Sequence, residues 1–155
     1  MKPMPLSKTQ LKQFLNETRL AHIATASIDG KPRVNPIWFV YENGSFYFTT
    51  RMGRLKGRHI QQNPHVALSV ASDKRPYRAV CAFGTALLLR DGRDEWLRKI
   101  GFRYGKREGK LWLREALKQP DRVVITVRPD QLLSWDYSHG DAERQGRGES
   151  MVTKD

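Results

Sequence analysis

The spacing of hydrophobic residues changes along the chain, and each change predicts a different element. Between Ser7 and Leu20 apolar residues recur every three or four positions, which is the spacing of one helix face. Ser7 and Gln10 resemble a capping box, so we expect an amphipathic helix over about residues 7–20. From residue 22 to residue 28 polar residues alternate with apolar or small ones, which predicts a strand.

Two short turn sequences divide the residues that follow into hairpins. Asp29-Gly30 and Asn43-Gly44 are dipeptides that favour the tight turns of β-hairpins. Strands over about Arg33–Tyr41 and Ser45–Thr50 are therefore expected to pair antiparallel. Together with the strand before them they form a meander.

The middle of the chain combines a short helix with two apolar strands. Residues 56–62 are predicted to be helical and to end at Asn63-Pro64, because the residue before a proline avoids helical geometry. Residues 66–71 and 79–89 are predicted to be buried strands. Gly84 marks a bulge or bend where the second strand curves round a barrel.

Residues 91–118 return to helical character before the sheet closes. Three glycines predict a break into two short helices: Gly101, Gly105 and Gly109. Two further strands, at 123–127 and 132–137, are expected on either side of Arg128-Pro129.

These elements predict a mainly β fold with added helices, of the α+β class, built as a largely antiparallel barrel. No strand is followed by the glycine-rich loop of a dinucleotide-binding fold. A chain of 155 residues fits one compact domain, which we place at residues 1–137. Residues 138–155 are charged and poor in apolar residues, so a flexible tail is expected.

Charge narrows the choice of partners. The chain has 28 Lys and Arg against 16 Asp and Glu, a formal net charge of +12, so phosphorylated small molecules and nucleic acid are the two classes to weigh. The cations are dispersed, without zinc-finger spacing or an RNA-reading aromatic motif. Nucleic acid is therefore not the expected partner, although a basic nucleic-acid-binding barrel remains an alternative.

The cysteine count and the apolar runs bear on the compartment. Cys81 lies in an apolar run without a partner in its own chain, so we interpret it as a small core residue and expect a reducing cytoplasm. The N-terminus lacks the apolar stretch of a signal peptide. No run approaches the roughly 18 apolar residues of a membrane span, so no membrane association is expected.

The strongest candidate site is a strand-to-helix corner. Thr49 and Thr50 end a predicted strand, Gly53 allows a sharp turn, and Arg54 and Lys56 stand at the start of the next helix. Hydroxyls, cations and the free N–H groups of a helix start together suit a phosphate. The alternative is a pair of solvated cations, but positive charge at a helix N-terminus opposes the macrodipole unless an anion is bound. The corner lacks the full P-loop pattern.

A second candidate is Asn35-Pro36-Ile37-Trp38, because a proline within a strand marks an edge or an irregularity and leaves peptide groups free. Trp38 packs either against a planar ligand ring or in a core or subunit interface. No metal-ligand spacing involves the four histidines, which are His22, His59, His65 and His139. No catalytic side chain is predicted, so a cofactor is expected to carry any chemistry.

Several segments together resemble the flavin-binding split β-barrel family related to pyridoxamine 5′-phosphate oxidase. The resemblance covers roughly residues 20–137 and is carried by IATASIDGKPRVNPIWFVYENGSFYFTT, the GRLK corner, HIQQNPHVALSV, PYRAVCAFGTALL and VRPDQLLSWDY. It implies a six-stranded antiparallel split barrel that forms a homodimer. It also implies flavin mononucleotide (FMN) in each of two clefts at the subunit interface.

The resemblance assigns roles to individual residues. Lys56 matches the residue that holds the cofactor phosphate, and its neighbours in the site are Arg54, Thr50 and Thr49. The cofactor ring is expected to run along Val34, Asn35, Pro36, Ile37 and Trp38, with Tyr77 and Arg78 brought toward it by the other subunit.

The chain differs from true pyridoxamine phosphate oxidases at its end, where the barrel closes at Ser134–Tyr137 without their arginine-containing segment. Vitamin B6 oxidation is therefore not expected. The GRxK corner also resembles that of members that use a 5-deazaflavin coenzyme. The implied function is hydride transfer between FMN and a small organic substrate; a deazaflavin-dependent reductase and a non-catalytic flavin- or haem-binding protein are the alternatives.

Overall fold

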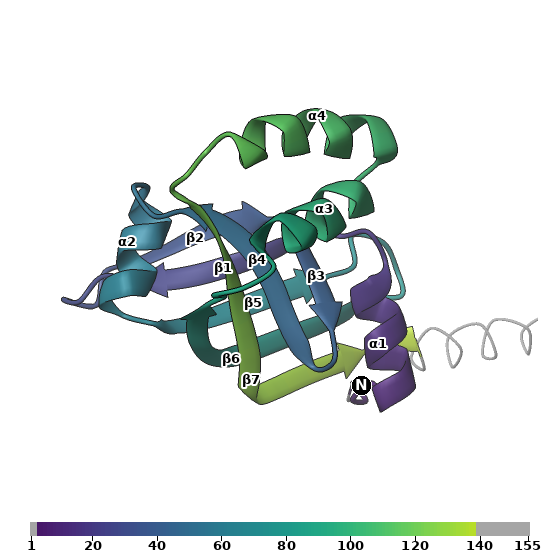
Figure 1. Ribbon diagram of the computed structural model, residues 1–155. Coiled ribbons are helices and arrows are strands. Elements are labelled where there is room, and N and C mark those ends of the chain that lie inside the picture. Colours follow the sequence, from purple (N-terminus) through teal and green to yellow (C-terminus); the bar gives the residue numbers. More distant parts are fainter. Residues whose placement is uncertain (1–2, 139–155) are drawn as a thin grey trace, which may run out of the picture.

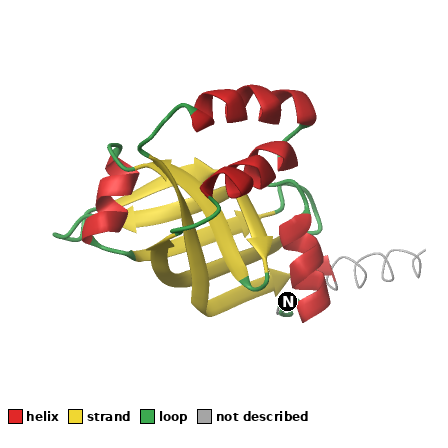
Figure 2. Cartoon of the chain, viewed as in Figure 1, coloured by secondary structure: helices red, strands yellow, loops and turns green. Residues whose placement is uncertain are grey.

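The structure is a computed structural model that describes residues 3–138, so the predicted tail beyond Ser138 lies outside the described residues. The described part contains a seven-stranded antiparallel sheet and four helices (Figure 1, Figure 2). The sheet curls into a half-barrel, with helices at its ends and on its outside. The predicted mainly β split-barrel fold is confirmed, with seven strands in place of six.

The order of the strands brings distant parts of the chain together. The strands are β1 Ala21–Ala26, β2 Pro32–Ile37, β3 Phe39–Glu42, β4 Ser45–Arg51, β5 His65–Ala71, β6 Arg78–Leu88 and β7 Arg122–Asp136. The helices are α1 Lys8–Asn16, α2 Leu55–Gln62, α3 Arg93–Arg103 and α4 Lys106–Leu117. Hydrogen-bonded neighbours follow the order β2-β1-β5-β6-β7-β4-β3. The consecutive strands β2 and β3 therefore lie at the two edges of the sheet.

The single strand expected over residues 33–41 is wrong. β2 pairs with β1, β3 pairs with β4, and Trp38 between them belongs to neither strand. The Trp38 ring stacks on Tyr104, with 4.6 Å between the ring centroids. The Tyr104 hydroxyl accepts a hydrogen bond from the Phe39 N–H at 3.0 Å. These contacts hold the chain where it passes from one edge to the other, and Pro36 is accommodated because β2 is an edge strand.

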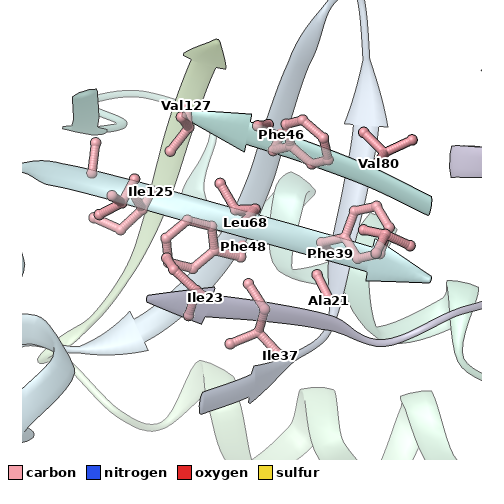
Figure 3. Close-up of a cluster of buried hydrophobic side chains, with 14 of the residues drawn as sticks. Ala21, Ile23, Ile37, Phe39, Phe46, Phe48, Leu68, Val80, Ile125 and Val127 are labelled. Carbon is pink, nitrogen blue, oxygen red and sulfur yellow. The ribbon is translucent and has the colours of Figure 1, made fainter. Parts of the chain in front are cut away.

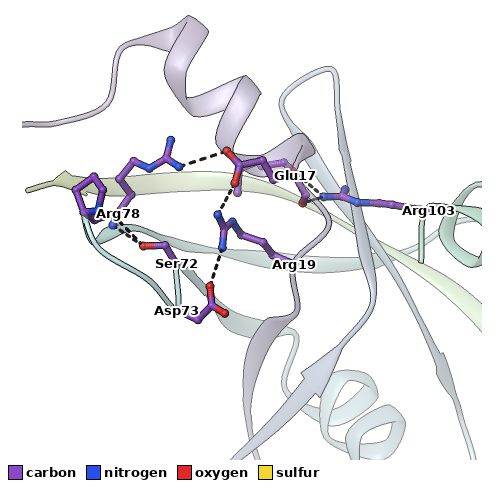
Figure 4. A network of polar contacts seen from close by, with 8 residues as sticks. Glu17, Arg19, Ser72, Asp73, Arg78 and Arg103 are labelled. Carbon is purple, nitrogen blue, oxygen red and sulfur yellow. Dashed lines mark hydrogen bonds and ion pairs between the residues drawn. The ribbon is translucent and has the colours of Figure 1, made fainter. Parts of the chain in front are cut away.

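The predicted local signals at the turns and at the first helix are confirmed in part. Asn43 has φ 52° and Gly44 has φ 78°, as a tight two-residue hairpin requires. The capping box of Ser7 and Gln10 is present. α1 ends at Asn16, before the expected end at about residue 20, and an Arg103 Nη atom donates to the Leu15 and Glu17 carbonyls, each at 2.6 Å (Figure 4).

The two strands expected around Arg128-Pro129 are one continuous strand, β7, so that prediction is wrong. β7 pairs with β6 from Ile125 to Asp136, and the register shifts between Phe83 and Gly84. The predicted irregularity at Gly84 is confirmed, although the extra residue, Asp130, lies on β7. Pro129 stands opposite Gly84, where the irregular ladder tolerates a residue without an N–H. A Cβ on Gly84 would lie 3.0 Å from the Arg128 carbonyl oxygen, so a side chain there would require the strands to shift by a few tenths of an ångström.

The core fills the inside of the half-barrel. Its largest fully buried side chains include four phenylalanines, which come from α1, β3 and β4: Phe14, Phe39, Phe46 and Phe48 (Figure 3). Cys81 does not belong to this core, so its predicted role is wrong. It is half-buried on the face of β6 opposite to Val80 and Ala82, because side chains alternate along a strand.

The predicted pair of short helices is confirmed as α3 and α4, which lie against one another outside the sheet (Figure 1). A Cβ on Gly109 would lie 2.2 Å from the Gly101 carbonyl oxygen, so glycine is needed for the helices to approach. α4 then leads through Gln119 into β7. Among the described helices, none is long and apolar enough to cross a membrane.

Candidate functional site

A polar cavity of about 430 Å³ lies where the end of β4, the start of α2, β2 and the start of β7 meet. Its lining comprises five cationic residues, four uncharged polar residues and one aliphatic residue: Arg33, Arg51, Arg54, Lys56 and Arg122, then Asn35, Thr49, Thr50 and Gln119, then Leu55. No carboxylate belongs to this lining. We call this cavity the anion pocket.

The strand-to-helix corner predicted from the sequence forms one wall of the anion pocket. Thr49, Thr50, Arg54 and Lys56 all line it, and Asn35 of β2 joins them from the edge strand. The structure thus brings together five of the residues that the sequence singled out.

The glycine that shapes this corner is not the expected one. Gly53 has no left-handed φ, and a Cβ there would lie 3.4 Å from an Asp121 oxygen, an ordinary contact. A Cβ on Gly57 would instead lie 2.5 Å from the Arg51 carbonyl oxygen. The first turn of α2 can pack against the end of β4 only because residue 57 has no side chain.

No residue of α2 itself compensates the dipole at its N-terminus, although the Asp121 carboxylate lies beside the preceding Gly53. Arg54 is its N-cap and makes no side-chain capping bond, and the first turn contains no acidic residue. The first N–H groups of a helix have no acceptor within the helix, and its N-terminus carries partial positive charge. Cations beside such a terminus repel it, so an anion bound here would satisfy both the amides and the side chains.

Partial burial strengthens this effect for Lys56. Burial lowers the pKa of the Lys56 ammonium below its ordinary value, and the nearby Arg122 guanidinium lowers it further. The pKa of Arg122 is itself lowered, first by burial and then by Arg51, with Asp121 acting in the opposite direction. The pocket therefore carries positive charge that its own residues neutralise only in part.

Arg122 is a pocket residue that the sequence reasoning missed. Its Nε donates to the Gln119 side-chain oxygen at 2.7 Å, and a terminal nitrogen lies 3.4 Å from the Thr49 hydroxyl. The guanidinium also lies over the Trp112 ring, 5.6 Å from its centroid. Its backbone is fixed as well, because the Arg93 Nε donates to the Arg122 carbonyl at 2.8 Å.

Arg51 was also missed, and it connects the two sides of the pocket. Its Nε lies 3.0 and 3.1 Å from the two Asp121 carboxylate oxygens, and this contact lowers the pKa of Asp121. The Met52 N–H donates to the Asp121 carbonyl at 2.9 Å. The loop before β7 is thereby bound to the corner after β4, so Arg51 is a partly neutralised cation.

The residues expected along a cofactor ring divide between the two faces of β2. Arg33 and Asn35 line the pocket, whereas Val34 is 63% exposed and Pro36 is also exposed. Ile37 is buried in the core. A strand presents alternate side chains to opposite faces. Consecutive residues of β2 can therefore contact the same ligand only through their main-chain groups.

The other three expected residues do not line the anion pocket of their own chain. The Trp38 side chain packs between Tyr104 and Trp112 within the chain, which favours the packing interpretation over ligand stacking. Tyr77 and Arg78 lie at the far end of β7 from Arg122, because Arg78 pairs with the final residue of that strand. Arg78 lies 3.4 Å from a Glu17 carboxylate oxygen (Figure 4).

The types of group that line the anion pocket decide which ligands it can recognise. Cations, hydroxyls and helix amides recognise phosphate and carboxylate groups, and the residues present fit the phosphate of a nucleotide-type coenzyme. Within residues 3–138, no group of three or more His, Cys, Asp or Glu could hold a metal ion. The pocket lining contains no positioned nucleophile and base, and its side chains are of the types that attract an anionic group.

Solved structures of other proteins share this fold. A conserved hypothetical protein from Mycobacterium tuberculosis is 22% identical, with 90% of this chain and 91% of that chain covered and a TM-score of 0.72. The haem storage protein HutZ from Vibrio cholerae is 18% identical, with 86% and 95% covered and a TM-score of 0.66. At these identities the likeness concerns the fold alone.

A structure described as an F420 reductase is more similar in sequence. It is 30% identical, with 78% of this chain and 94% of that chain covered and a TM-score of 0.63. No curated protein sequence matches the chain significantly. The sequence pattern of the family described as pyridoxamine 5′-phosphate oxidase matches residues 7–136, a span that holds every strand and all the lining of the anion pocket. The chain therefore belongs to the pyridoxamine 5′-phosphate oxidase family.

Proposed function

We propose that this protein is an oxidoreductase whose redox chemistry is carried by a bound flavin-type coenzyme, FMN or a 5-deazaflavin. The observation that carries the proposal is the anion pocket, with five cationic residues and no carboxylate in its lining. Lys56, Arg54 and Thr50 hold the coenzyme phosphate together with the first amides of α2. When bound, such a coenzyme supplies hydride transfer.

The chain's own part in this function is to bind and orient. Thr49 donates its hydroxyl to the Val123 carbonyl at 2.8 Å, so this side chain fixes β4 against β7 while its oxygen stays close to Arg122. The ring of the coenzyme lies along the main chain of β2. The stacking of Trp38 on Tyr104 holds the end of β2 in place.

The charge of the pocket favours the deazaflavin over FMN, the coenzyme expected first from the sequence. Of the five lining cations, Arg51 is paired with Asp121, which leaves four without a carboxylate partner in the lining. A phosphate monoester supplies about two negative charges at neutral pH. A deazaflavin coenzyme with an acidic tail brings further anionic groups for the remaining cations. The 30% identity to an F420 reductase supports the same choice.

A homodimer is part of the proposal, with Tyr77 and Arg78 of the second subunit reaching the ring. Two observations support it. The ring edge formed by β2 is open to solvent in one chain, and apolar side chains stand exposed on the outer faces of β6 and β7: Phe83, Leu87 and Leu133. Large exposed apolar patches mark interaction sites.

Titration of the purified protein with FMN and with coenzyme F420 tests the proposal. Binding is measured by the visible absorbance of the coenzyme and by the tryptophan fluorescence, since the Trp112 ring lies against Arg122 of the anion pocket. We expect F420 to bind more tightly than FMN, and FMN more tightly than riboflavin, which has no phosphate. Failure of both phosphorylated coenzymes to bind would overturn the proposed function.

Turnover separates an enzyme from a coenzyme-binding protein. The bound coenzyme is reduced chemically, and its reoxidation by a panel of small planar organic acceptors is followed under anaerobic conditions. Acceptor-dependent reoxidation, faster than for free reduced coenzyme, is expected of an oxidoreductase. Tight binding without any such acceleration would favour the non-catalytic flavin-binding alternative.

A further inference from the structure

A second cavity lies between α1 and the hairpin of β3 and β4, far from the anion pocket. Its volume is about 750 Å³, against about 430 Å³ for the anion pocket, and the two share no lining residue. β4 runs from one to the other: Arg51 at its end lines the anion pocket, whereas Gly44 just before its start lines the second cavity. In Figure 1, α1 stands beside β3 at this end of the barrel. We call this cavity the α1 groove.

Three cations from two elements surround the α1 groove. Lys8 and Lys12 are one turn apart on α1, so they stand on the same face of that helix, and Arg128 comes from β7. Within residues 3–138 no carboxylate lies within ion-pair distance of any of these three side chains. Glu42 is the one carboxylate of the groove lining, and it is engaged by the Lys99 ammonium at 3.3 Å. The groove therefore presents net positive charge.

The same groove has a firm apolar wall. Leu11 packs against the main core cluster, and so does Tyr41, whose ring lies 4.9 Å from the Phe46 ring centroid. Val40 adds a half-buried aliphatic side chain from the edge strand. Because Leu11 and Tyr41 are anchored against the core, a ligand would meet a preformed surface rather than loose surface chains.

Tyr41 adds a hydrogen-bond donor at the base of the wall. Burial raises the pKa of its phenol, while the nearby Arg128 acts in the opposite direction, so the hydroxyl keeps its proton at neutral pH. A protonated phenol beside an arginine can donate to the same oxyanion that the arginine attracts. The polar and apolar features thus lie side by side within one cavity.

We propose that the α1 groove binds an amphipathic organic anion, a molecule with one carboxylate or phosphate group on an apolar body. The volume is within the range of small-molecule sites. The head group lies against Lys12, Arg128 and the Tyr41 hydroxyl, and the apolar body lies along Leu11 and Val40. The two cavities share no lining residue, so this proposal does not depend on the coenzyme.

Heteronuclear NMR titration of the full chain tests the proposal with three probes. Octanoate has both features, octan-1-ol has the apolar body without the charge, and inorganic phosphate has the charge without the apolar body. We expect octanoate to shift the amide resonances of α1 and β3 with an affinity at least fivefold above that of octan-1-ol. Phosphate is expected to shift the start of α2 instead.

A double variant and its matched control locate the site. Lys12→Gln with Arg128→Gln removes two exposed cations of the groove and is expected to weaken octanoate binding at least fivefold, with the α2 response to phosphate unchanged. Lys110→Gln with Arg114→Gln removes two exposed cations from α4 and is expected to leave octanoate binding unchanged. Equal binding of octanoate and octan-1-ol, shifts centred elsewhere, or an unaffected groove variant would overturn the proposal.

Discussion

The two halves of the proposed coenzyme site differ in how completely one chain builds them. At the anion pocket, side chains from β4, α2 and β7 converge, and the guanidinium of Arg122 is fixed by Gln119 and Thr49. At the ring edge, β2 presents Val34 63% exposed and Pro36 exposed, with a strand on one side only. One half is preformed, and the other is open.

Because of this difference, we expect the two halves to contribute differently to coenzyme binding. Preorganised charges spend little free energy on ordering when a ligand binds, so the anion pocket is expected to supply most of the affinity. The open edge contributes orientation, and its second wall comes from whatever covers β2. One chain therefore determines how the anionic group is bound, whereas the surroundings of the ring also depend on whatever covers β2.

Replacement of Lys56 by alanine is expected to have the largest effect. Hydrogen bonds to charged groups contribute about 1.5–3 kcal/mol, so Lys56→Ala should weaken coenzyme binding roughly 10- to 150-fold. Isothermal titration calorimetry measures this change. Lys110→Ala, which removes an exposed cation outside the pocket, is the matched control and should change affinity less than twofold. An unchanged affinity in Lys56→Ala would remove the phosphate assignment.

Replacement of Arg122 by glutamine is expected to have a smaller effect, because two consequences oppose each other. The variant loses a cation, but it also relieves the repulsion that lowers the pKa of Lys56. We expect a loss of affinity of about fivefold, near 1 kcal/mol, measured by the same titration. Arg122→Lys should lie between wild type and Arg122→Gln, since it keeps the charge and loses the contact with Gln119. A loss as large as that of Lys56→Ala would mean that Arg122 is the main anchor.

The features that the sequence predicted well are those decided within a few residues. The Asn43-Gly44 turn, the capping box at Ser7 and the helix after Lys56 each depend on local backbone geometry. The corner at Arg54 and Lys56 could be identified for the same reason, since its hydroxyls, cations and helix start are neighbours in the chain.

The features that could not be predicted from the sequence depend on contacts between distant segments of the chain. Arg51 stands opposite Arg122 only because β4 pairs with β7, and no local pattern reports that register. Pro129 predicted a break, but β7 continues through it, because the pairing with β6 skips Asp130 and this irregularity tolerates a residue without an N–H. Trp38 divides its strand because Tyr104, far along the chain, stacks on it. Tertiary contacts override local preference at each of these places.

The pH dependence of coenzyme binding gives a third test of the anion pocket, because it reports proton binding to Lys56. Burial and Arg122 lower the pKa of free Lys56, whereas a bound anion favours the charged form and raises that pKa. At a pH between the Lys56 pKa of the free protein and that of the complex, the complex holds more protons than the free protein. The coenzyme affinity therefore falls as the pH rises through the pKa of free Lys56, and it is constant well below that pKa. We expect the affinity to decrease as the pH rises from neutral into the alkaline range, measured at constant ionic strength.

The control for this pH dependence is Lys56→Arg, because arginine stays protonated throughout the range. Its affinity should be independent of pH where that of the wild type falls. A wild-type profile as flat as that of the variant would mean that Lys56 keeps its proton in both states.

The open half is expected to respond least to substitution. Val34→Ser replaces an exposed aliphatic side chain on the face of β2 opposite to Arg33 and Asn35, so main-chain contacts with the ring are kept and coenzyme affinity should change by no more than about twofold. Inorganic phosphate, which has no ring, should bind the variant and the wild type equally. Val40→Ser, on β3 outside the site, is the control and should change neither affinity. A loss of phosphate binding in Val34→Ser would contradict the division between the halves, because it would mean that the ring edge helps to shape the anion pocket itself.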